Sequence, residues 1–293
     1  MNQNNDRSKY IKWTFLPIIL VLCIDAVVET IATEGIAVYA LATFKGTTVA
    51  EFYTSLVSII MSPLYLGFVY IPYAVISIIV FGILYKKLFK SDTKIGFLKA
   101  SGNKPVTLVG AVLFALGMQY VTMYLIVAIA SAFPALFESY QGLMESAGFN
   151  DYTSIVITVY ALCLGPIAEE LVFRGLTFNS AKQYMPIPAA IALQAFLFGV
   201  FHKNMLQGIY ACIFGLGLGY VMYLFDDIFL CILVHILFNI FGTYGSGVLP
   251  FGGNTIIGFF GWVLGSLILA YIALIILRKS KATVNNQDSF TDI

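Results

Sequence analysis

One short stretch in the middle of the chain decides how the rest is interpreted. It reads Gly165-Pro166-Ile167-Ala168-Glu169-Glu170-Leu171-Val172-Phe173-Arg174-Gly175. The stretch places three ionisable side chains inside a long apolar run, where each ionised group costs about 2.5–3.5 kcal/mol near a bilayer centre. Glu170 and Arg174 are four residues apart and can pair on one helix face. Glu169 is rotated by about 100° from Glu170, so the pattern predicts one neutralised carboxylate and one available for chemistry.

Pro166 stands just before these carboxylates. In the middle of a helix a proline removes one backbone hydrogen bond and kinks the helix. We therefore expect a loosened backbone one turn before Glu169.

The composition places this stretch in a membrane. Of the 293 residues, 60% are hydrophobic and only 11% are charged, whereas a soluble domain carries about 25% charged residues. We predict an all-α fold, a polytopic transmembrane helical bundle. The net charge of +1 argues against nucleic acid as a partner. The four cysteines lie in apolar segments without CxxC spacing, which is typical of small buried hydrophobes.

The apolar residues fall into eight segments, each near the roughly 20 residues that a spanning helix needs. They lie at about 13–41, 55–85, 106–134, 153–179, 187–202, 205–225, 228–243 and 255–277. We predict one transmembrane domain at 12–281 with about eight spans. The polar tails at 1–11 and 282–293 are expected to be disordered.

The basic residues predict the orientation of the bundle, because cytoplasmic loops are enriched in Lys and Arg. They gather in the N-terminal tail, in the loop after the second segment and at the start of the C-terminal tail: Arg7, Lys9, Lys12, Lys86, Lys87, Lys90, Lys94, Lys99, Lys104, Arg278, Lys279 and Lys281. Eight spans put all three groups on one side, so both termini are expected in the cytoplasm. The connection at 135–151 carries Glu138, Glu145 and Asp151 without a basic residue, as expected of an outer loop.

The two histidines of the chain lie in later apolar segments. One ends the run Phe198-Gly199-Val200-Phe201-His202, and the other begins the run His235-Ile236-Leu237-Phe238-Asn239. His235 and Asn239 share a helix face, and Phe198 lies one turn from His202, where it can shield the imidazole from lipid. A carboxylate, two imidazoles and an amide suit hydrolysis. A carboxylate assisted by an imidazole can take a proton from water, and an imidazole–amide pair can stabilise an oxyanion.

The three motifs together resemble a known family. Glu-Glu-x-x-x-Arg, Phe-x-x-x-His and His-x-x-x-Asn, in this order on separate segments, are similar to those of the CPBP (Abi) family of intramembrane proteases. That family includes the type II CAAX prenyl endopeptidases and bacteriocin-processing or immunity proteins. The resemblance covers about residues 150–245, which we expect to form a protease-like core.

The resemblance implies a role for each motif residue. Glu169 acts as the general base with His202, and His235 and Asn239 stabilise the oxyanion. Glu170, Arg174 and Phe198 support these four. The implied substrate is a peptide or a membrane protein, with or without a lipid modification, and membrane lipids surround the enzyme. Together with the short loops, the resemblance favours a bacterial cell membrane.

The sequence lacks one motif that is typical of zinc proteases. No HExxH is present, so we favour a glutamate mechanism without a metal or other cofactor. A divalent metal such as zinc is the alternative, because the family has also been described as metalloproteases.

Other functions fit the same residues. Intramembrane carboxylates and histidines are typical of proton-coupled transporters, although the internal repeat common in transporters is missing. A non-catalytic membrane immunity or scaffold protein is a further alternative. Each group also has a structural interpretation: the Glu-Glu-Arg group as a buried ion network, the first histidine as an interfacial residue, and the His–Asn pair as an interhelical hydrogen-bonding pair.

The topology contains one conflict. At a rise of 1.5 Å per residue, the eight-span arrangement places Glu169 towards the inner face and His202 at the outer face, so that the two side chains cannot meet. Either the boundaries of the fourth and fifth segments differ from those predicted, or these helices are tilted or sunk into a cavity. We favour the motif constellation over the boundaries.

Acidic residues outside the motifs have less specific interpretations. Asp25, Glu29 and Glu34 lie in the first segment, which either is shorter than drawn or lines a polar cavity or substrate path. Asp226 and Asp227 are expected to cap the following helix or to lie at an interface. The pairs Gly215-x-x-x-Gly219 and Gly261-x-x-x-Gly265 permit close helix approach and support a packed bundle.

Overall fold

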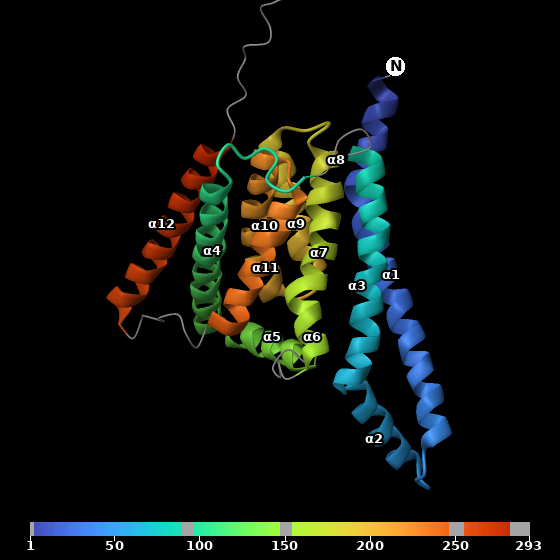
Figure 1. Ribbon diagram of the computed structural model, residues 1–293. Helices are drawn as coiled ribbons and strands as arrows, with labels where there is room; N and C mark the ends of the chain where they lie inside the picture. Colours follow the sequence, from blue (N-terminus) through green and yellow to red (C-terminus); the bar gives the residue numbers. More distant parts are fainter. Residues whose placement is uncertain (1–2, 90–95, 147–153, 246–254, 282–293) are drawn as a thin grey trace, which may run out of the picture. The chain divides into compact units, whose positions relative to one another are not determined.

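The computed structural model describes residues 3–89, 96–146, 154–245 and 255–281 (Figure 1). These residues form helices and connecting turns, with a single isolated β-bridge between Ser101 and Lys281. The all-α prediction is therefore confirmed. The elements in chain order are α1 (Gln3–Thr43), α2 (Val49–Ile60), α3 (Pro63–Phe89), α4 (Lys104–Ala132), α5 (Pro134–Ser146), α6 (Ile155–Val159), η1 (Tyr160–Leu164), α7 (Gly165–Glu170), η2 (Leu171–Phe178), α8 (Asn179–Ala181), α9 (Ile187–Phe201), α10 (Met205–Phe225), α11 (Ile228–Tyr244) and α12 (Ile256–Ser280). Lys90, Lys94, Asp151 and the tail 282–293 lie outside the described residues.

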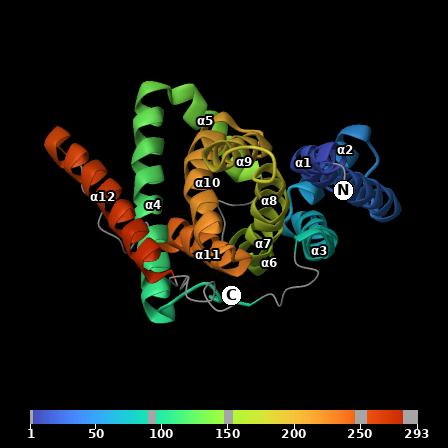
Figure 2. The same ribbon diagram turned by 90° about the horizontal axis from the view of Figure 1, so that it is seen from above.

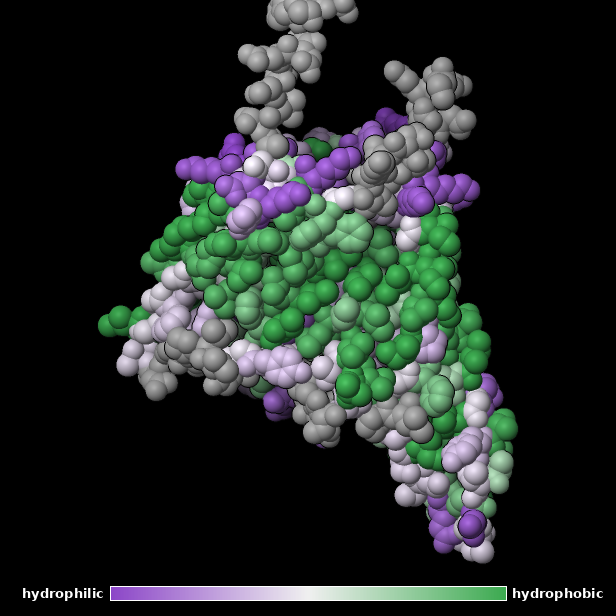
Figure 3. Space-filling model, in the orientation of Figure 1, coloured by the Kyte–Doolittle hydropathy of each residue, from purple (hydrophilic) through white to green (hydrophobic). Residues whose placement is uncertain are grey.

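The eight predicted apolar segments all coincide with helices. Among the described residues, six helices are long and apolar enough to cross a membrane, the longest of them Arg7–Thr43. The fifth and seventh predicted segments are the shorter helices α9 and α11. Many large apolar side chains are exposed on these helices, and the space-filling view shows a mostly hydrophobic surface over them (Figure 3). The protein is an integral membrane protein.

The N-terminal segment differs from the prediction. Helix α1 begins at Gln3, so residues 3–11 are helical and do not form a disordered tail. The physical reason is that an existing helix extends at one hydrogen bond per added residue, without a new nucleation step.

The second predicted segment is split into two helices. Helix α2 begins with a capping box, in which Thr48 accepts from the amide of Glu51 and the Glu51 carboxylate accepts from the amide of Thr48. The amides of Thr47 and Thr48 also lower the pKa of the exposed Glu51 carboxyl. Met61 and Ser62 then separate α2 from α3, which starts at Pro63. A proline disfavours helix at the residue before it and fits the first helical turn, which explains the break.

The chain divides into two compact units. The first comprises residues 1–94 and 124–219, and the second comprises residues 95–123 and 220–293. In the first unit, α1 and α3 lie side by side (Figures 1 and 2), and both pack against η2, which also contacts α9. The three short helices α6, α7 and α8, with the two π-helical segments η1 and η2 between them, continue one another as a single span, Ile155–Ala181.

Close backbone contacts hold the second unit together. A Cβ atom at Gly117 of α4 would lie 2.8 Å from the amide nitrogen of Ala270 of α12, so only a glycine allows these helices to come so close. Thr107 donates to Ser280 at 2.7 Å on the same pair of helices. Asp227 caps α11 by accepting from the amides of Phe229 and Leu230, which confirms its predicted role.

Only one of the two predicted glycine pairs mediates helix packing. Gly215 and Gly219 of α10 lie against α9, and a Cβ atom at Gly219 would meet the amide of Gln194 at 2.4 Å. For Gly261 and Gly265 of α12, the space that a Cβ atom would occupy is open among the described residues. This second pair therefore mediates no close helix contact among the described residues, since small residues permit close approach without producing it.

Candidate active site

Both motif carboxylates lie on the short helix α7 between two π-helical segments. The amide of Gly165 donates to the carbonyl of Tyr160, five residues earlier, and Pro166 follows in the first turn of α7. Proline has no N–H to donate, and the wider π-helical turn accommodates it without breaking the span. The predicted disturbance next to Glu169 is thus present as a local widening of the helix. π-Helical turns inside α-helices are frequent at functional sites.

Glu170 and Arg174 form the predicted ion pair. Nη1 of Arg174 donates to Oε1 of Glu170 at 2.8 Å, and both side chains are fully buried. The amide group of Asn179 donates to the carbonyls of Arg174 and Gly175 at 3.2 and 3.0 Å. The side chain of Asn179 therefore satisfies two backbone acceptors of the π-helical segment η2, which sequence reasoning did not predict.

The aromatic ring of Phe198 connects this ion pair to His202. The guanidinium carbon of Arg174 lies 4.5 Å from the Phe198 ring centroid, within the range of a cation–π interaction. Phe198 also contacts His202, and their ring centroids lie 4.9 Å apart. Phe173 of η2 also packs against Phe198 and Phe201, at 5.0 and 5.4 Å. Phe198 is buried, so it shields one side of the imidazole, as the sequence predicted.

These contacts bear on the conflict in the predicted topology. Helix α9 has only 15 residues and packs against η2. Because Arg174 and His202 both contact the ring of Phe198, the end of α9 that carries His202 lies beside the π-helical segment that follows Glu169. The depth of the two side chains in the membrane stays a prediction.

His202 lies at the turn between α9 and α10. It is the C-cap residue of α9, and its amide donates to the carbonyl of Gly199 at 3.3 Å. Its side chain is half-buried. Lys203 follows in the left-handed region with φ 58°, which ends the helix sharply. The imidazole is thus presented at a helix terminus, where the chain reverses.

Glu169 is half-buried beside a group of aromatic side chains. Its carboxylate interacts electrostatically with the phenol groups of Tyr73 and Tyr160. The rings of Tyr70 and Tyr160 stack at 4.5 Å, and Tyr73 lies 6.5 Å from Tyr160. We call Tyr70, Tyr73 and Tyr160 the tyrosine cluster. Sequence reasoning missed it, because tyrosine is abundant in the chain and each member lies on an otherwise ordinary apolar segment.

A second connection leads from the tyrosine cluster towards His202. Asp25 of α1 interacts electrostatically with all three tyrosines. The same carboxylate binds Nζ of Lys203 at 3.0 Å. Asp25 therefore links the tyrosine cluster, with which Glu169 also interacts, to the residue that follows His202.

His235 and Asn239 lie four residues apart on α11 of the second unit. His235 is buried and Asn239 is half-buried. About one turn later on α11, a Cβ atom at Gly242 would lie 3.2 Å from the side-chain amide nitrogen of Gln119 on α4. Their shared helix face matches the prediction, whereas their convergence with Glu169 and His202 stays a prediction.

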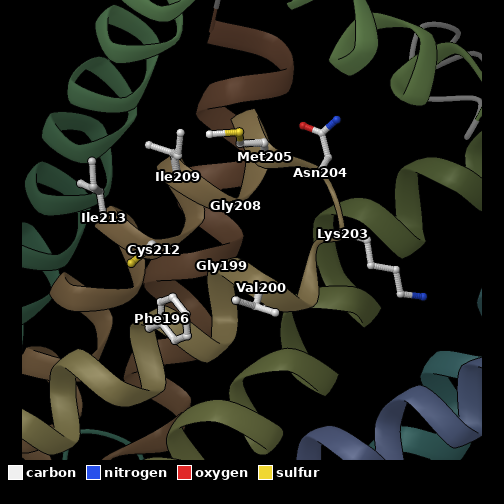
Figure 4. A pocket seen from close by; sticks show the side chains of 10 residues that line it. All are labelled: Phe196, Gly199, Val200, Lys203, Asn204, Met205, Gly208, Ile209, Cys212 and Ile213. Carbon is white, nitrogen blue, oxygen red and sulfur yellow. The ribbon is translucent and has the colours of Figure 1, made fainter. Parts of the chain in front are cut away.

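An apolar groove lies next to the His202 turn, between α9 and α10 (Figure 4). It has a volume of about 520 Å³. Its lining residues are Phe196, Gly199, Val200, Lys203, Asn204, Met205, Gly208, Ile209, Cys212 and Ile213. The two glycines let the helices meet closely, since a Cβ atom at Gly199 would lie 2.5 Å from the carbonyl oxygen of Gly208. Phe196, Val200 and Met205 are exposed, so the groove opens to the hydrophobic surface.

A catalytic zinc ion would need a group of protein ligands close together. Such sites use three protein ligands and leave one position open. Among the described residues, no three His, Cys, Asp or Glu side chains are grouped so that they could hold a metal ion. We therefore derive no step through a metal.

The fold and the site define a class of protein: a polytopic helical membrane protein with a carboxylate and an imidazole on adjoining helices inside the bundle. Comparison with known families finds a match to one part of the chain. Residues 151–241 match the family described as "Type II CAAX prenyl endopeptidase Rce1-like". This confirms the resemblance to the CPBP family, and the matched segment includes Glu169, His202, His235 and Asn239. No curated protein and no solved structure matches the chain significantly.

Proposed function

We propose that the protein is an intramembrane endopeptidase that hydrolyses a peptide bond of a membrane-associated peptide or protein. The match to a protease family supports a hydrolase acting on peptide bonds. One structural observation carries the proposal for the site. Tyr73 and Tyr160 interact with both Glu169 and Asp25, and Asp25 is paired with the residue that follows His202. Both connections lie within the first compact unit, and they support a site shared by Glu169 and His202.

In the proposed mechanism, Glu169 and His202 activate a water molecule. Glu169 accepts a proton from the water, and His202 orients the water or relays the proton to the leaving amine. Arg174 neutralises the carboxylate of Glu170, so that Glu170 does not compete with Glu169 for the proton of the water. The tyrosine cluster covers Glu169 with aromatic surface and limits its contact with bulk water.

His235 and Asn239 complete the proposed mechanism. Attack on a peptide carbonyl places negative charge on its oxygen, and preorganised donors stabilise that charge. The imidazole N–H and the side-chain amide supply two such donors from one helix face of α11. Loss of one donor of this kind typically costs about 10²–10³ in kcat.

The groove beside His202 is the proposed site for the apolar part of the substrate. It is lined mainly by apolar side chains, opens to the hydrophobic surface and ends at the residues next to His202. A lipidated or strongly apolar peptide can therefore place its hydrophobic part in the groove while its backbone reaches the turn. The printed family description names prenyl endopeptidases, and a farnesylated peptide is accordingly the first probe to use.

Filling the groove is expected to weaken substrate binding without slowing the chemical step. In Val200→Trp, the larger side chain occupies space in the groove, and we expect KM for a farnesylated peptide to rise about tenfold with kcat within about twofold. Cleavage by the purified protein in liposomes provides the measurement. Ile268→Trp, at an exposed position on α12, is the matched control. Equal KM values for Val200→Trp and the control would reject the groove as the binding site.

Metal chelation is expected to leave cleavage unchanged. The proposed mechanism uses only protein side chains, and the donor groups do not form a three-ligand site among the described residues. Purified protein is incubated with 1,10-phenanthroline and assayed at matched dilution. Loss of cleavage that returns specifically on addition of Zn²⁺ would contradict the metal-free mechanism.

A further inference from the structure

The first helix contains a carboxylate that the proposed mechanism does not use. Asp25 lies within the apolar span Arg7–Thr43, where an ionised group is costly and usually marks a functional contact. Its partner is far away in the sequence. Nζ of Lys203 lies 3.0 Å from Oδ2 of Asp25, and the two side chains are 65% and 31% exposed, respectively.

Lys203 belongs to the backbone turn that carries His202, so its ion pair acts on that turn. Helix α9 ends at Phe201, His202 closes it, and Lys203 adopts a left-handed backbone conformation. A residue with a side chain rarely adopts this conformation without support from its surroundings. Asn204 then begins the next helix by accepting from the amide of Gln207 at 3.1 Å. The turn that carries His202 is thus only three residues long.

The turn is held from two sides within the first unit. On one side, the imidazole of His202 packs against Phe198 and Phe201, with ring centroids at 4.9 and 5.8 Å. On the other side, Lys203 reaches α1. Figure 4 shows its side chain leaving the groove and pointing towards the blue ribbon of α1, where Asp25 accepts from it. Rotation of the turn would separate the ammonium group from the carboxylate.

We propose that the ion pair of Asp25 and Lys203 is a positioning pair that fixes the His202 turn against α1 and so orients the imidazole towards Glu169. The inference deepens the proposed peptidase function, and its kinetic readout rests on that function. Separating the two charges in an apolar environment is unfavourable, because little solvent is there to replace the lost partner. The pair therefore restrains the turn more strongly than the same contact would on a soluble surface.

A simpler role of the pair is to compensate two charges in the membrane. That role predicts a loss of stability when one charge is removed, but no specific change at His202. A readout at the imidazole itself therefore separates the two roles, and it does not require peptidase activity.

The experiment compares His202 reactivity in a small set of variants. The variants are Asp25→Asn, Lys203→Met, Lys203→Arg and the charge swap Asp25→Lys with Lys203→Asp. Glu34→Gln, at an exposed carboxylate on the same helix, is the matched control. Modification of His202 by diethyl pyrocarbonate is followed by mass spectrometry, with His235, the only other histidine, as the internal reference. Thermal unfolding identifies any variant that is not folded.

We expect the two neutralising variants to change the His202 modification rate severalfold relative to His235. Lys203→Arg, the charge swap and Glu34→Gln should stay close to the original protein. In cleavage assays, the neutralising variants should lose about 10- to 100-fold in kcat with little change in KM, because a displacement of about 1 Å at a catalytic group costs about that much.

Two results would overturn the inference. The first is a His202 modification rate that is unchanged in both folded neutralising variants. The second is a charge swap that behaves like the single variants, since the individual charges rather than their pairing would then matter. If the original protein cleaves no peptide but His202 reactivity follows the pairing, the positioning role stands and the proposed peptidase function fails.

Discussion

Replacement of Glu169 by Gln is expected to reduce kcat/KM by about 10³, the typical contribution of a general base, while the protein keeps its fold. Glutamine has nearly the same shape but cannot accept the proton of the attacking water. Glu169 is half-buried and belongs to a helix whose stabilising ion pair is formed by its neighbour, so the substitution should not lower stability appreciably. Cleavage of a farnesylated peptide and of its unmodified counterpart, in liposomes, measures the effect for both substrate types.

The control for this prediction is the same substitution elsewhere. Glu145→Gln changes an exposed carboxylate on α5 and should leave cleavage at the original rate. A folded Glu169→Gln protein that still cleaves would exclude Glu169 as the base. Loss of cleavage together with a lowered unfolding temperature would instead assign Glu169 a structural role.

Arg174→Met is expected to destabilise the protein by about 3–5 kcal/mol, the usual effect of removing one partner from a buried ion pair. The substitution leaves the Glu170 carboxylate without its cation in a fully buried site. It also removes the cation from the face of Phe198. Unfolding in detergent micelles with increasing denaturing detergent measures the loss.

The double variant Glu170→Leu with Arg174→Met tests the cause. Replacing a buried ion pair by apolar side chains of similar volume is often neutral, so the double variant should recover most of the lost stability. If the double variant is no more stable than Arg174→Met alone, the arginine stabilises the fold through contacts other than its pairing with Glu170. Substitution of Glu169 is thus expected to lower activity but not stability. Breaking the ion pair of its neighbour Glu170 is expected to lower stability.

Local spacing was enough to predict much of the fold and part of the site. The eight apolar segments, the pairing of Glu170 with Arg174 and the contact of Phe198 with His202 all follow from helix length or from residues four apart. Such contacts involve one helix only, and their geometry is nearly independent of the rest of the fold.

The features that sequence reasoning missed depend on long-range contacts or on small changes in helix geometry. Asp25 and Lys203 are 178 residues apart, and no spacing rule connects them. The π-helical segments change the backbone by one extra residue per turn and leave the apolar pattern nearly intact. The position of the His202 turn depends on where α9 ends, and a difference of a few residues at a helix end is not visible in the apolar pattern.

The short α9 helix has a consequence for the supply of the second reactant, water. Its 15 residues extend about 22 Å, whereas the hydrocarbon layer is about 30 Å thick. We therefore expect the chain reversal at its end to lie several ångströms short of the headgroups of the opposite leaflet. A bilayer adjusts to so short a span by local thinning, which is expected to shorten the path of water from the surface to the His202 turn.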